Sequence, residues 1–391
     1  MVFDIRLRAI CQNDPAHSGE LAGHTADARR TDHPAAKEFT MEVPPNGAEP
    51  SAQGSSVPNR VLVTGGAGFI GSHVVARLML MGIHVKVLDD FSTGRVENLA
   101  DAAYGGLSQS DVLRGDIRTA EAVDVIHEWR PEVVVHLAGQ GSLQAARESP
   151  LFDADVNTFG TINVLDACAR SGVRLFVHAA SSAIYGNVAS DALPIREDRP
   201  LAATSPYGIS KAVGVCYLDW YRREHGMSYT ALAFGNVYGP RPTGGGTSVV
   251  ALMTEALLNG QPPTIYGDGQ QTRDYVHIVD VADAVARACH YPGAGLVNIA
   301  TGRETTVNDL FELVCSVVGV DCDPHYAPHP HPQEVRRMAL DSSKALAQLG
   351  WRPTIGLTEG VQLTVREARR RRTGAQRAYQ PRQGQPVGVG H

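Results

Sequence analysis

Short apolar runs alternate with stretches of helical periodicity along the middle of the chain. The first apolar run leads into a glycine-rich turn, and the helical pattern that follows it stops at Gly82. Apolar residues three and four apart indicate a helix, whereas a short β-branched run indicates a buried strand. The predicted strands are 60–64, 84–88, 133–137, 175–179 and 229–234, and the predicted helices are 71–81, 119–129, 155–171 and 206–224. This alternation predicts an α/β fold, a doubly wound parallel Rossmann sheet with helices on both faces.

The pattern becomes less regular after residue 235. Glycine- and proline-rich loops separate shorter helical patches at 249–259, 279–289 and 307–318. We therefore expect a sheet domain at 59–235 and a smaller C-terminal substrate-binding lobe at 236–365, with some segments of the lobe returning to the main sheet. A ligand cleft between the two is the natural consequence.

Both ends of the chain lack this pattern. Residues 1–58 are rich in Ala, Pro, Gly, Ser, His and charge, so they predict a disordered extension, and Met41 within it leaves a later start open. From Arg366 the chain runs through four arginines at 369–372 into Gly, Gln and Pro, which predicts a disordered tail at 366–391. The arginine run is interpreted as a solvated helix end rather than as a contact for an acidic partner.

Composition narrows the class of protein. The chain has 391 residues, 43% of them hydrophobic, and a formal net charge of −6. These values are ordinary for a globular protein and argue against a general nucleic-acid binder. No stretch approaches the roughly 20 apolar residues that span a bilayer, and the first thirty residues lack a secretory signal. We expect a small-molecule partner, no nucleic acid, no membrane and a cytoplasmic location.

Cysteine and histidine spacing predicts no metal site. The six cysteines are scattered without a CxxC pair, and we expect reduced thiols. The cluster of His325, His329 and His331 is interleaved with proline and lacks carboxylate or cysteine partners, so it is interpreted as a loop.

The turn after the first predicted strand has the spacing of a dinucleotide site. Gly65 allows a tight turn, Gly68 lets backbone amides approach a pyrophosphate, and Gly71 lets the helix pack closely on the strand. The second strand leads to Asp89, whose carboxylate can accept hydrogen bonds from ribose hydroxyls and repels a 2′-phosphate. The sequence therefore predicts NAD rather than NADP, although Arg95 keeps the second open. The alternative is a strand–helix turn that binds no cofactor.

A second candidate position follows a further strand that we expect between Asp89 and Asp116. Asp116 and Ile117 are placed to meet the adenine edge, and a carboxylate that only caps the loop is the alternative for Asp116.

A hydroxyl, a phenol and an ammonium supply the candidate chemistry. Tyr207 and Lys211 lie four residues apart on a predicted helix, hence on one face, and only four lysines occur in the chain. Because an ammonium beside a phenol favours the phenolate, the pair can act as a base near neutral pH. Ser181 and Ser182 follow the strand at 175–179, where ligands collect. Together these groups can take a proton from a secondary alcohol while its hydride leaves.

In this order the motifs resemble the extended short-chain dehydrogenase/reductase family, the NAD-dependent nucleotide-sugar epimerases and dehydratases. The resemblance covers about 59–365. It is carried by the segments 64–73, 88–94, 115–118, 136–139, 157–161, 181–186, 207–211, 236–241 and 267–277.

The resemblance implies roles for individual residues. Tyr207 resembles the catalytic base, Lys211 the residue that grips the nicotinamide ribose, and Ser181 the hydroxyl that bonds the sugar oxygen, with Ser182 as the alternative. Asn157 resembles the residue that supports the active-site network, although an asparagine within a helix can also be a local cap or kink. The family also assigns Phe69, Ile70 and Ala138 to the cofactor, and Asn236, Arg241, Arg273 and Glu334 to the nucleotide-sugar substrate.

The chain departs from the family pattern at two points. Ala233 stands where relatives often have arginine, and His331 replaces the usual arginine of a late phosphate-binding segment. Arg336 or Arg337 is the candidate to compensate for the second change. These departures leave the identity of the nucleotide open.

The residues after Ser181 favour one reaction of the family. The dehydratases and decarboxylases are similar in carrying an acid just after the active-site hydroxyl, where this chain has Ser182 and Ala183. Without that acid, the expected function is C4 epimerisation of a UDP-hexose through a transient 4-keto intermediate. The alternatives are a nucleotide-sugar 4,6-dehydratase or reductase and a non-catalytic nucleotide-binding protein. The resemblance further implies a homodimer that packs two helices of each subunit into a four-helix bundle.

Overall fold

The computed structural model describes residues 57–241, 248–291, 293–331 and 335–378. Almost all of the extension predicted at 1–58, the substrate residue Glu334, and residues 379–391 of the predicted tail lie outside these ranges.

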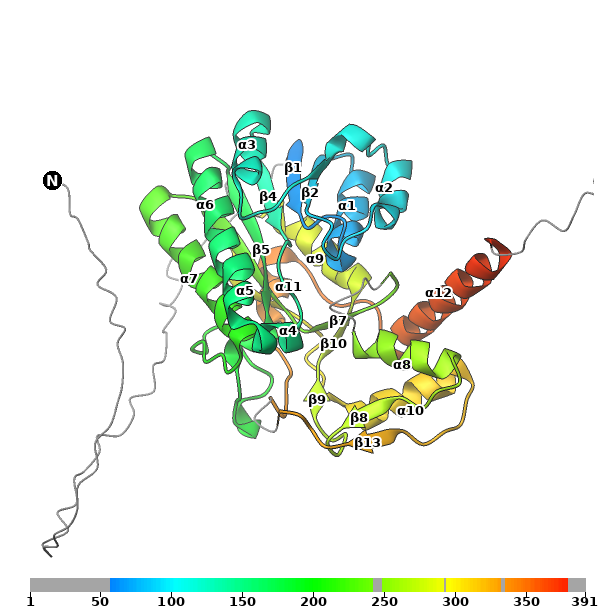
Figure 1. Ribbon diagram of the computed structural model, residues 1–391. Coiled ribbons are helices and arrows are strands. Elements are labelled where there is room, and N and C mark those ends of the chain that lie inside the picture. The colour runs from blue at the N-terminus through cyan, green and yellow to red at the C-terminus, as the bar shows by residue number, and fades with distance from the viewer. Residues whose placement is uncertain (1–56, 242–247, 292, 332–334, 379–391) are drawn as a thin grey trace, which may run out of the picture. The chain divides into compact units, whose positions relative to one another are not determined.

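One sheet of seven parallel strands organises the molecule (Figure 1). Its order is β11-β6-β5-β4-β1-β2-β3. The strands are β1 (Arg60–Thr64), β2 (His84–Asp89), β3 (Val112–Arg114), β4 (Val133–His136), β5 (Leu175–Ser181), β6 (Ser228–Phe234) and β11 (Gly295–Ile299). The chain leaves β1 toward β3 on one side and β4 toward β6 on the other, so the order reverses between β1 and β4. This topology confirms the predicted doubly wound α/β fold and places a ligand crevice at that reversal.

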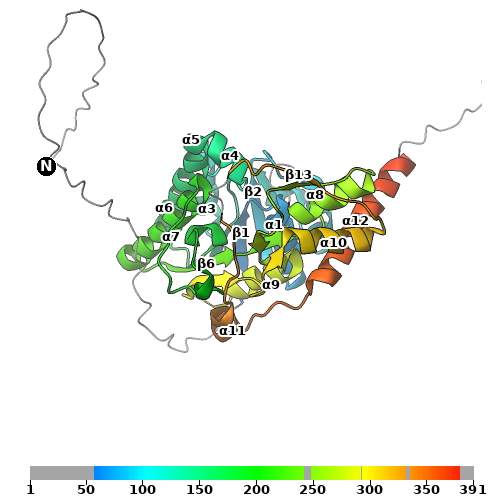
Figure 2. The same cartoon turned by 90° about the horizontal axis from the view of Figure 1, so that it is seen from below.

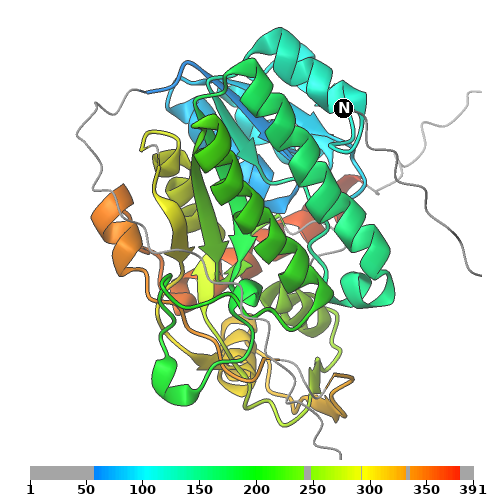
Figure 3. The ribbon, with the colours of Figure 1, turned by 90° about the vertical axis from the view of Figure 1, so that its left-hand side faces the viewer.

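Helices cover both faces of the sheet, as the alternating pattern predicts. On one face lie α1 (Phe69–Leu80) and α9 (Ile278–Ala288), which pack against each other. On the other lie α3 (Ala120–Trp129), α6 (Gly160–Ser171) and α7 (Pro206–His225), with α6 and α7 side by side in Figure 3. Because the strands are buried on both faces, they are runs of Val, Leu and Ala rather than alternating segments.

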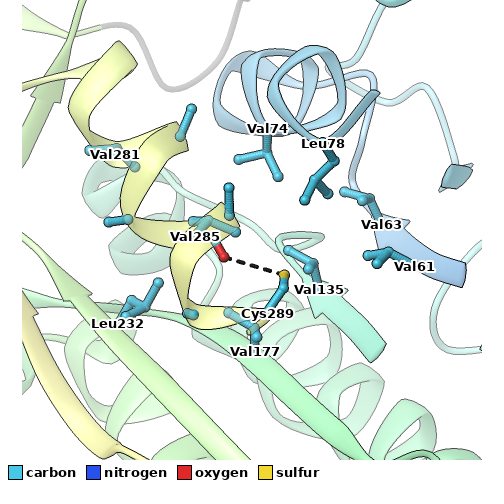
Figure 4. Close-up of a cluster of buried hydrophobic side chains, with 14 of the residues drawn as sticks. Val61, Val63, Val74, Leu78, Val135, Val177, Leu232, Val281, Val285 and Cys289 are labelled. Carbon is cyan, nitrogen blue, oxygen red and sulfur yellow. Dashed lines mark hydrogen bonds between the residues drawn. The ribbon is translucent and has the colours of Figure 1, made fainter. Parts of the chain in front are cut away.

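The core beneath α1 and α9 shows how this packing works (Figure 4). Val61 and Val63 of β1, Val74 of α1 and Val285 of α9 belong to one cluster, and all four side chains are fully buried. Burying each such side chain contributes about 1.5–3 kcal/mol, so the cluster holds α1 against the sheet beside the glycine turn.

Short elements connect these layers. They are η1 (Val96–Leu99), α2 (Ala100–Tyr104), η2 (Gln109–Asp111), α4 (Leu143–Glu148), α5 (Pro150–Ala154), the π-helical turn η3 (Asp155–Phe159), η4 (Ser182–Tyr185), η5 (Ser190–Ala192) and α11 (Ser343–Leu349).

A smaller lobe has its own core. Its helices α8 (Val249–Leu258), α10 (Val307–Val318) and α12 (Leu357–Ala378) pack together, as Figure 2 also shows. Short strand pairs accompany them: β7 (Asn236–Tyr238) with β10 (Tyr275–His277), β8 (Thr264–Tyr266) with β13 (His325–Ala327), and β9 (Thr272–Arg273) with β12 (Thr305–Thr306). Tyr238, Val250, Leu310 and Val361 are buried in this core. By contrast, α9 and β11 belong to the layers of the main sheet.

The predicted start of the tail at Arg366 is wrong, because α12 continues to Ala378. Val361 and Val365 anchor the helix in the lobe core, with 0% and 1% of their surface exposed. The arginine run then continues the helix: Arg369 Nη2 donates to the carbonyl of Val318 at 2.8 Å, and Arg370 pairs with Glu367. Arginine favours helices, so tertiary anchoring of the preceding turn is enough to extend it. Among the described residues, no helix is long and apolar enough to cross a membrane.

Candidate active site

A cavity of about 1050 Å³ opens at the carboxyl ends of the parallel strands. Its wall includes Gly65 after β1, Asp89 at the end of β2, Ala138 after β4 and Ser181 at the end of β5. The lobe closes the other side with Val249 and Leu252 of α8, Arg273 and Met338. The position agrees with the crevice expected at the reversal of strand order.

The glycine turn leaves space that any side chain would fill. Gly65 has φ +69°, and a Cβ there would lie 2.6 Å from the backbone N of Ala138. A Cβ on Gly71 would lie 2.1 Å from the carbonyl oxygen of Gly65. Gly65, Gly68 and Gly71 line the cavity together with Phe69 and Ile70, next to the N-terminus of α1, where backbone amides favour an anion. The turn therefore has the shape of a pyrophosphate cradle.

Asp89 is held in place by the same turn. Its Oδ2 accepts from the amide of Ala67 at 2.9 Å and its Oδ1 from the amide of Phe91 at 2.9 Å. Burial raises the pKa of this carboxyl, and the two amide bonds oppose that rise. A carboxylate oxygen can accept more than one hydrogen bond, so Asp89 can also receive ribose hydroxyls in the cavity that it lines.

Asp116 and Ile117 both line the cavity, beyond β3. Asp116 forms an ion pair with Arg118, whose hydrogen bonds hold the pKa of the Asp116 carboxyl below its usual range. Arg118 also pairs with Asp155 at 2.6 Å. Asp116 therefore stabilises its own loop, as the alternative interpretation expects, and it also lines the cavity. Ile117 is buried, with 5% of its surface exposed.

Ser181 and Tyr207 converge as the sequence predicts. Ser181 ends β5 and Tyr207 lies in the first turn of α7, which Ser205 caps through a bond from the amide of Gly208 at 3.1 Å. Burial raises the pKa of the Tyr207 phenol, a hydrogen bond from Ser181 lowers it, and the charge of Asp153 raises it. Lys211 is not among the groups that shift the pKa of Tyr207, so the lowering expected from the neighbouring ammonium is not seen, and burial is the largest cause. Ser182 also lines the cavity.

Lys211 lies under the cavity floor rather than in its wall. Its side chain is almost fully buried, and a Cβ on Gly139 would lie 3.2 Å from Lys211 Nζ and 2.7 Å from Asn157 Oδ1. Burial lowers the pKa of Lys211 to about 8, and the charge of Asp153 opposes this. Gly139, which lines the cavity, therefore lies next to the ammonium, and a side chain at this position would crowd both Lys211 and Asn157.

The pKa of Lys211 predicts an alkaline limit for activity. Below about pH 8 the buried group carries its positive charge, and above that pH it becomes neutral. If the ammonium grips the cofactor and supports the phenolate, turnover should fall as the pH rises through this value. We expect kcat measured from pH 6 to 10 to show a descending limb near pH 8. The variant Lys211→Arg, whose guanidinium keeps its charge, should lack this limb at any activity that it retains; an unchanged limb would contradict the assignment.

Asn157 occupies the π-helical turn η3 and supports the loop after β4. Its Oδ1 accepts from the amide of Gln140 at 2.9 Å, and its Nδ2 donates to the carbonyl of Gln140 at 3.0 Å. Asn157 is 2% exposed and does not line the cavity. This geometry matches a supporting role in the network, and π-helical turns are frequent at functional sites.

The residues predicted to bind substrate separate into two groups. Asn236 and Arg273 line the cavity, and the amide of Asn236 donates to the carbonyl of Asp274 at 2.7 Å. Arg241 does not line it: its Nη1 donates to the carbonyl of Asn98 at 2.9 Å, and it pairs with Asp101 beside a separate cavity of about 540 Å³. Position after β7 alone could not reveal this, because Arg241 has φ +63° and turns away.

Neither candidate to replace the missing arginine reaches the cavity. Arg336 pairs with Asp268 and Arg337 with Glu304. Val335 and Met338, which flank them, line the cavity instead.

The sequence missed several groups at the site. Gln140, Arg147 and Leu252 line the cavity, and the buried Asp153 accepts a hydrogen bond from Gln140. Gln140 follows the end of β4 and was detectable from that position. Arg147 and Asp153 lie on short helices without a motif, so no sequence signal marked them.

Comparison with known proteins agrees with this geometry. A family model described as GDP-mannose 4,6 dehydratase matches residues 62–364. The UDP-glucose 4-epimerase of Mycolicibacterium smegmatis is 41% identical over 309 residues, which cover 78% of this chain and 97% of that protein. The chain belongs to the NAD-dependent epimerase/dehydratase family. As a member of this family it uses NAD, and the glycine cradle and Asp89 fit that cofactor.

Solved structures of the epimerase/dehydratase family align with almost their full length. The UDP-glucose 4-epimerase of Thermotoga maritima with UDP-glucose has a TM-score of 0.74 and 40% identity, and covers 80% of this chain and 99% of that one. The UDP-glucose 4-epimerase of Thermus thermophilus in complex with NAD has a TM-score of 0.72 and 38% identity, and covers 79% of this chain and 99% of that one.

Proposed function

We propose that this protein is a UDP-hexose 4-epimerase that works through a transient 4-keto sugar. One observation carries the choice within the family. Among the described residues, the carboxylates that line the cavity are Asp89, Asp90 and Asp116. All three belong to the β2 and β3 side, and β1 and β4 separate them from Ser181 on β5. At about 4.8 Å per strand, this is too far to take a C5 proton from a sugar held at Ser181 and Tyr207.

The residues at the strand ends can carry the proton steps. Tyr207 takes the proton of the 4-hydroxyl, and Ser181 donates a hydrogen bond to the phenol oxygen so that negative charge is tolerated there. Lys211 beneath them contributes positive charge and a donor for the cofactor ribose. NAD, which the glycine turn and Asp89 would hold, would supply the acceptor and then the donor of the C4 hydride. On return of the hydride to the opposite face, Tyr207 gives its proton back, so no net redox change occurs.

The cavity also suits rotation of the keto sugar. Val249, Leu252 and Met338 form an apolar wall that offers the sugar no fixed hydrogen bonds. Arg273 and Asn236 lie at the same cavity and are the candidates to hold the diphosphate, because a guanidinium binds phosphate oxygens strongly. Epimerisation requires that both faces of the sugar C4 can reach one hydride position. A sugar that is loosely held while its nucleotide is fixed meets this requirement.

Two other functions would leave different products. A 4,6-dehydratase, the description carried by the matching family model, would release water and lower the product mass. A non-catalytic binding protein would leave the nucleotide sugar unchanged, but it would have no need to keep Ser181, Tyr207 and Lys211 together.

The decisive experiment offers the purified protein a panel of UDP-, dTDP- and GDP-hexoses. We expect the C4 epimer of a UDP-hexose with unchanged mass after chromatographic separation. A product lighter by one water would replace the epimerase with a dehydratase, and no conversion with NAD bound would favour a binding protein.

We further propose a homodimer, because an apolar surface covers the outer side of two long helices. Residues 150–171 form one helix through α5, η3 and α6, which lies beside α7 (Figure 3). Its exposed apolar side chains include Leu151 at 86% and Phe159 at 55%, and α7 adds Ile209 at 49% and Trp220 at 43%. Such a patch is typical of an interface, and a two-fold axis would bring two helices of each subunit into a bundle.

Replacing Ile209 and Leu151 by glutamate should therefore give a monomer. A charge at the centre of an apolar interface opposes association because it must be desolvated. Light scattering coupled to size exclusion measures the outcome. The matched control is Leu80→Glu, since Leu80 is 78% exposed at the end of α1, on the other side of the sheet. A wild-type monomer, or a double variant that stays dimeric, would contradict this interface.

A further inference from the structure

Asp153 is a buried carboxylate for which the reaction outlined above has no role. It lies on α5 and is 1% exposed. Its Oδ1 accepts from Gln140 Nε2 and from Asn157 Nδ2, both at 3.0 Å, whereas its Oδ2 is buried without a hydrogen-bond partner among the described residues. Burying a carboxylate oxygen without a hydrogen-bond partner lowers the stability of the folded protein. We therefore expect a nearby positive charge or a functional role to compensate.

The hydrogen bonds of Asp153 lead to the catalytic residues from below. Asn157 joins it to the backbone of Gln140 on the cavity wall. Asn157 Nδ2 also lies 3.3 Å from Ser210 Oγ, and that hydroxyl donates to the carbonyl of Tyr207 at 3.0 Å. Hydrogen bonds among four side chains therefore link the loop after β4 to the first turn of α7; the four are Asp153, Gln140, Asn157 and Ser210.

The charge of Asp153 also links it to Tyr207 and Lys211. The charge of Asp153 raises the pKa of both Lys211 and Tyr207, and no other charged group in the described part of the chain contributes to either shift. Two further ionisable groups lie near Lys211, namely His136 and His178, and burial lowers the pKa of each so that both are neutral. Within the described ranges, the buried ammonium of Lys211 thus has a single counter-charge.

Other ionisable groups lie on the elements packed around α5. The elements packed against α5 are α4, η3 and the first turns of α7. They bring Arg147 and Glu148 from α4, Asp155 from η3, and Tyr207 and Lys211 from α7. Glu148 accepts from Gln144, Asp155 pairs with Arg118, and Arg147 lines the cavity.

We propose that Asp153 is a positioning residue of the epimerase: it holds Gln140 and Asn157 under the cavity and provides the counter-charge for Lys211 beside Tyr207. This rests on the proposed function, since the pair must act on a sugar hydroxyl for its charge to matter in turnover. Asp153 does not line the cavity, so its role is to position and charge-balance other residues.

The test is the isosteric variant Asp153→Asn, assayed for kcat from pH 6 to 10. Without the negative neighbour, the phenol ionises more readily and the ammonium loses its proton more readily. The descending limb should move to lower pH, and kcat at pH 9 should fall on the order of tenfold. Asp153→Glu keeps the charge and should restore the position of that limb. The matched control is Asp124→Asn, which removes an equal charge from the exposed side of α3.

Each result is decisive for the role of Asp153. An Asp153→Asn variant with wild-type kcat and an unmoved descending limb would overturn the proposal. A lower kcat with an unmoved limb would overturn the role of Asp153 as counter-charge. If Asp153→Asn does not fold, the double variant Asp153→Asn with Lys211→Met should fold, because it leaves no unpaired buried charge. Failure of that double variant would also overturn the counter-charge.

A readout without turnover separates this proposal from the proposed function. The affinity for NAD should fall with rising pH as Lys211 loses its proton, and in Asp153→Asn this fall should begin at lower pH. An unchanged NAD titration would count against Asp153, whereas a wild-type protein that epimerises no UDP-hexose would count against the function.

Discussion

Replacing Tyr207 by phenylalanine should abolish epimerisation while the protein keeps its fold and its NAD. The phenol is the group beside Ser181 that can take and return the sugar proton, and general-base catalysis contributes about 10²–10⁴-fold in rate. Because the ring of phenylalanine fills the same space on α7, the cavity should not collapse. We expect kcat to fall on the order of 10³-fold, as measured by conversion of the UDP-hexose with bound NAD quantified after denaturation.

A second tyrosine provides the control for this substitution. Tyr266 is 50% exposed on β8 and does not line the cavity, so Tyr266→Phe should keep the wild-type kcat. If Tyr207→Phe retained a tenth or more of wild-type turnover with NAD in place, Tyr207 would not be the base. The hydrogen bond between Ser181 and Tyr207 would then have no role in the proton transfer.

The second large effect is expected at the cofactor cradle. Gly71→Ala would place a methyl group 2.1 Å from the carbonyl oxygen of Gly65, and that atom belongs to the backbone of the turn. The turn or α1 must therefore shift, although the buried contacts of Val74 and Leu78 hold α1 against the sheet. Overpacking of this kind costs about 1–3 kcal/mol. We expect a lower melting temperature and purified protein with little bound NAD.

Graded controls separate the steric effect from helix propensity. Alanine is favoured over glycine within a helix by about 1 kcal/mol, so a loss of stability at Gly71 must come from the clash. A Cβ on Gly68 would lie 3.2 Å from the same oxygen and should cost less, and one on Gly356 meets nothing within 4 Å. Full NAD content and stability in Gly71→Ala would contradict the close approach of helix and strand.

Local patterns were sufficient for most of the sheet. The run at 60–64 coincides with β1, and the predicted helix at 307–318 coincides with α10. Both have a continuous apolar run or an amphipathic repeat bounded by glycine or a capping residue, and such signals act within one element. The sequence did not predict the short strand β11 (Gly295–Ile299). Its place in the sheet is evident only from its pairing with β6.

The tail shows the limit of composition as evidence. The glycine, glutamine and proline beyond 369–372 favoured a disordered tail from Arg366, whereas the arginine run itself was interpreted as a helix end, and α12 continues through it to Ala378. The deciding residues, Val361 and Val365, lie upstream and gain their stability from Tyr238, Leu310 and other lobe residues distant in sequence. Helices in proteins draw most of their stability from such packing, which composition does not report.

The sequence alone specified the chemistry that depends on spacing: the glycines of the turn, Asp89 one strand later, and Tyr207 four residues before Lys211 on one helix face. These spacings could be interpreted without the fold because each is set by the geometry of local elements. The fold was needed to turn Arg241 away toward Asp101, to bury Lys211 until its pKa falls to about 8, and to bring Asp153 beneath it. Burial and charge pairing join residues from separate elements, so they arise only when the packed helices exclude water.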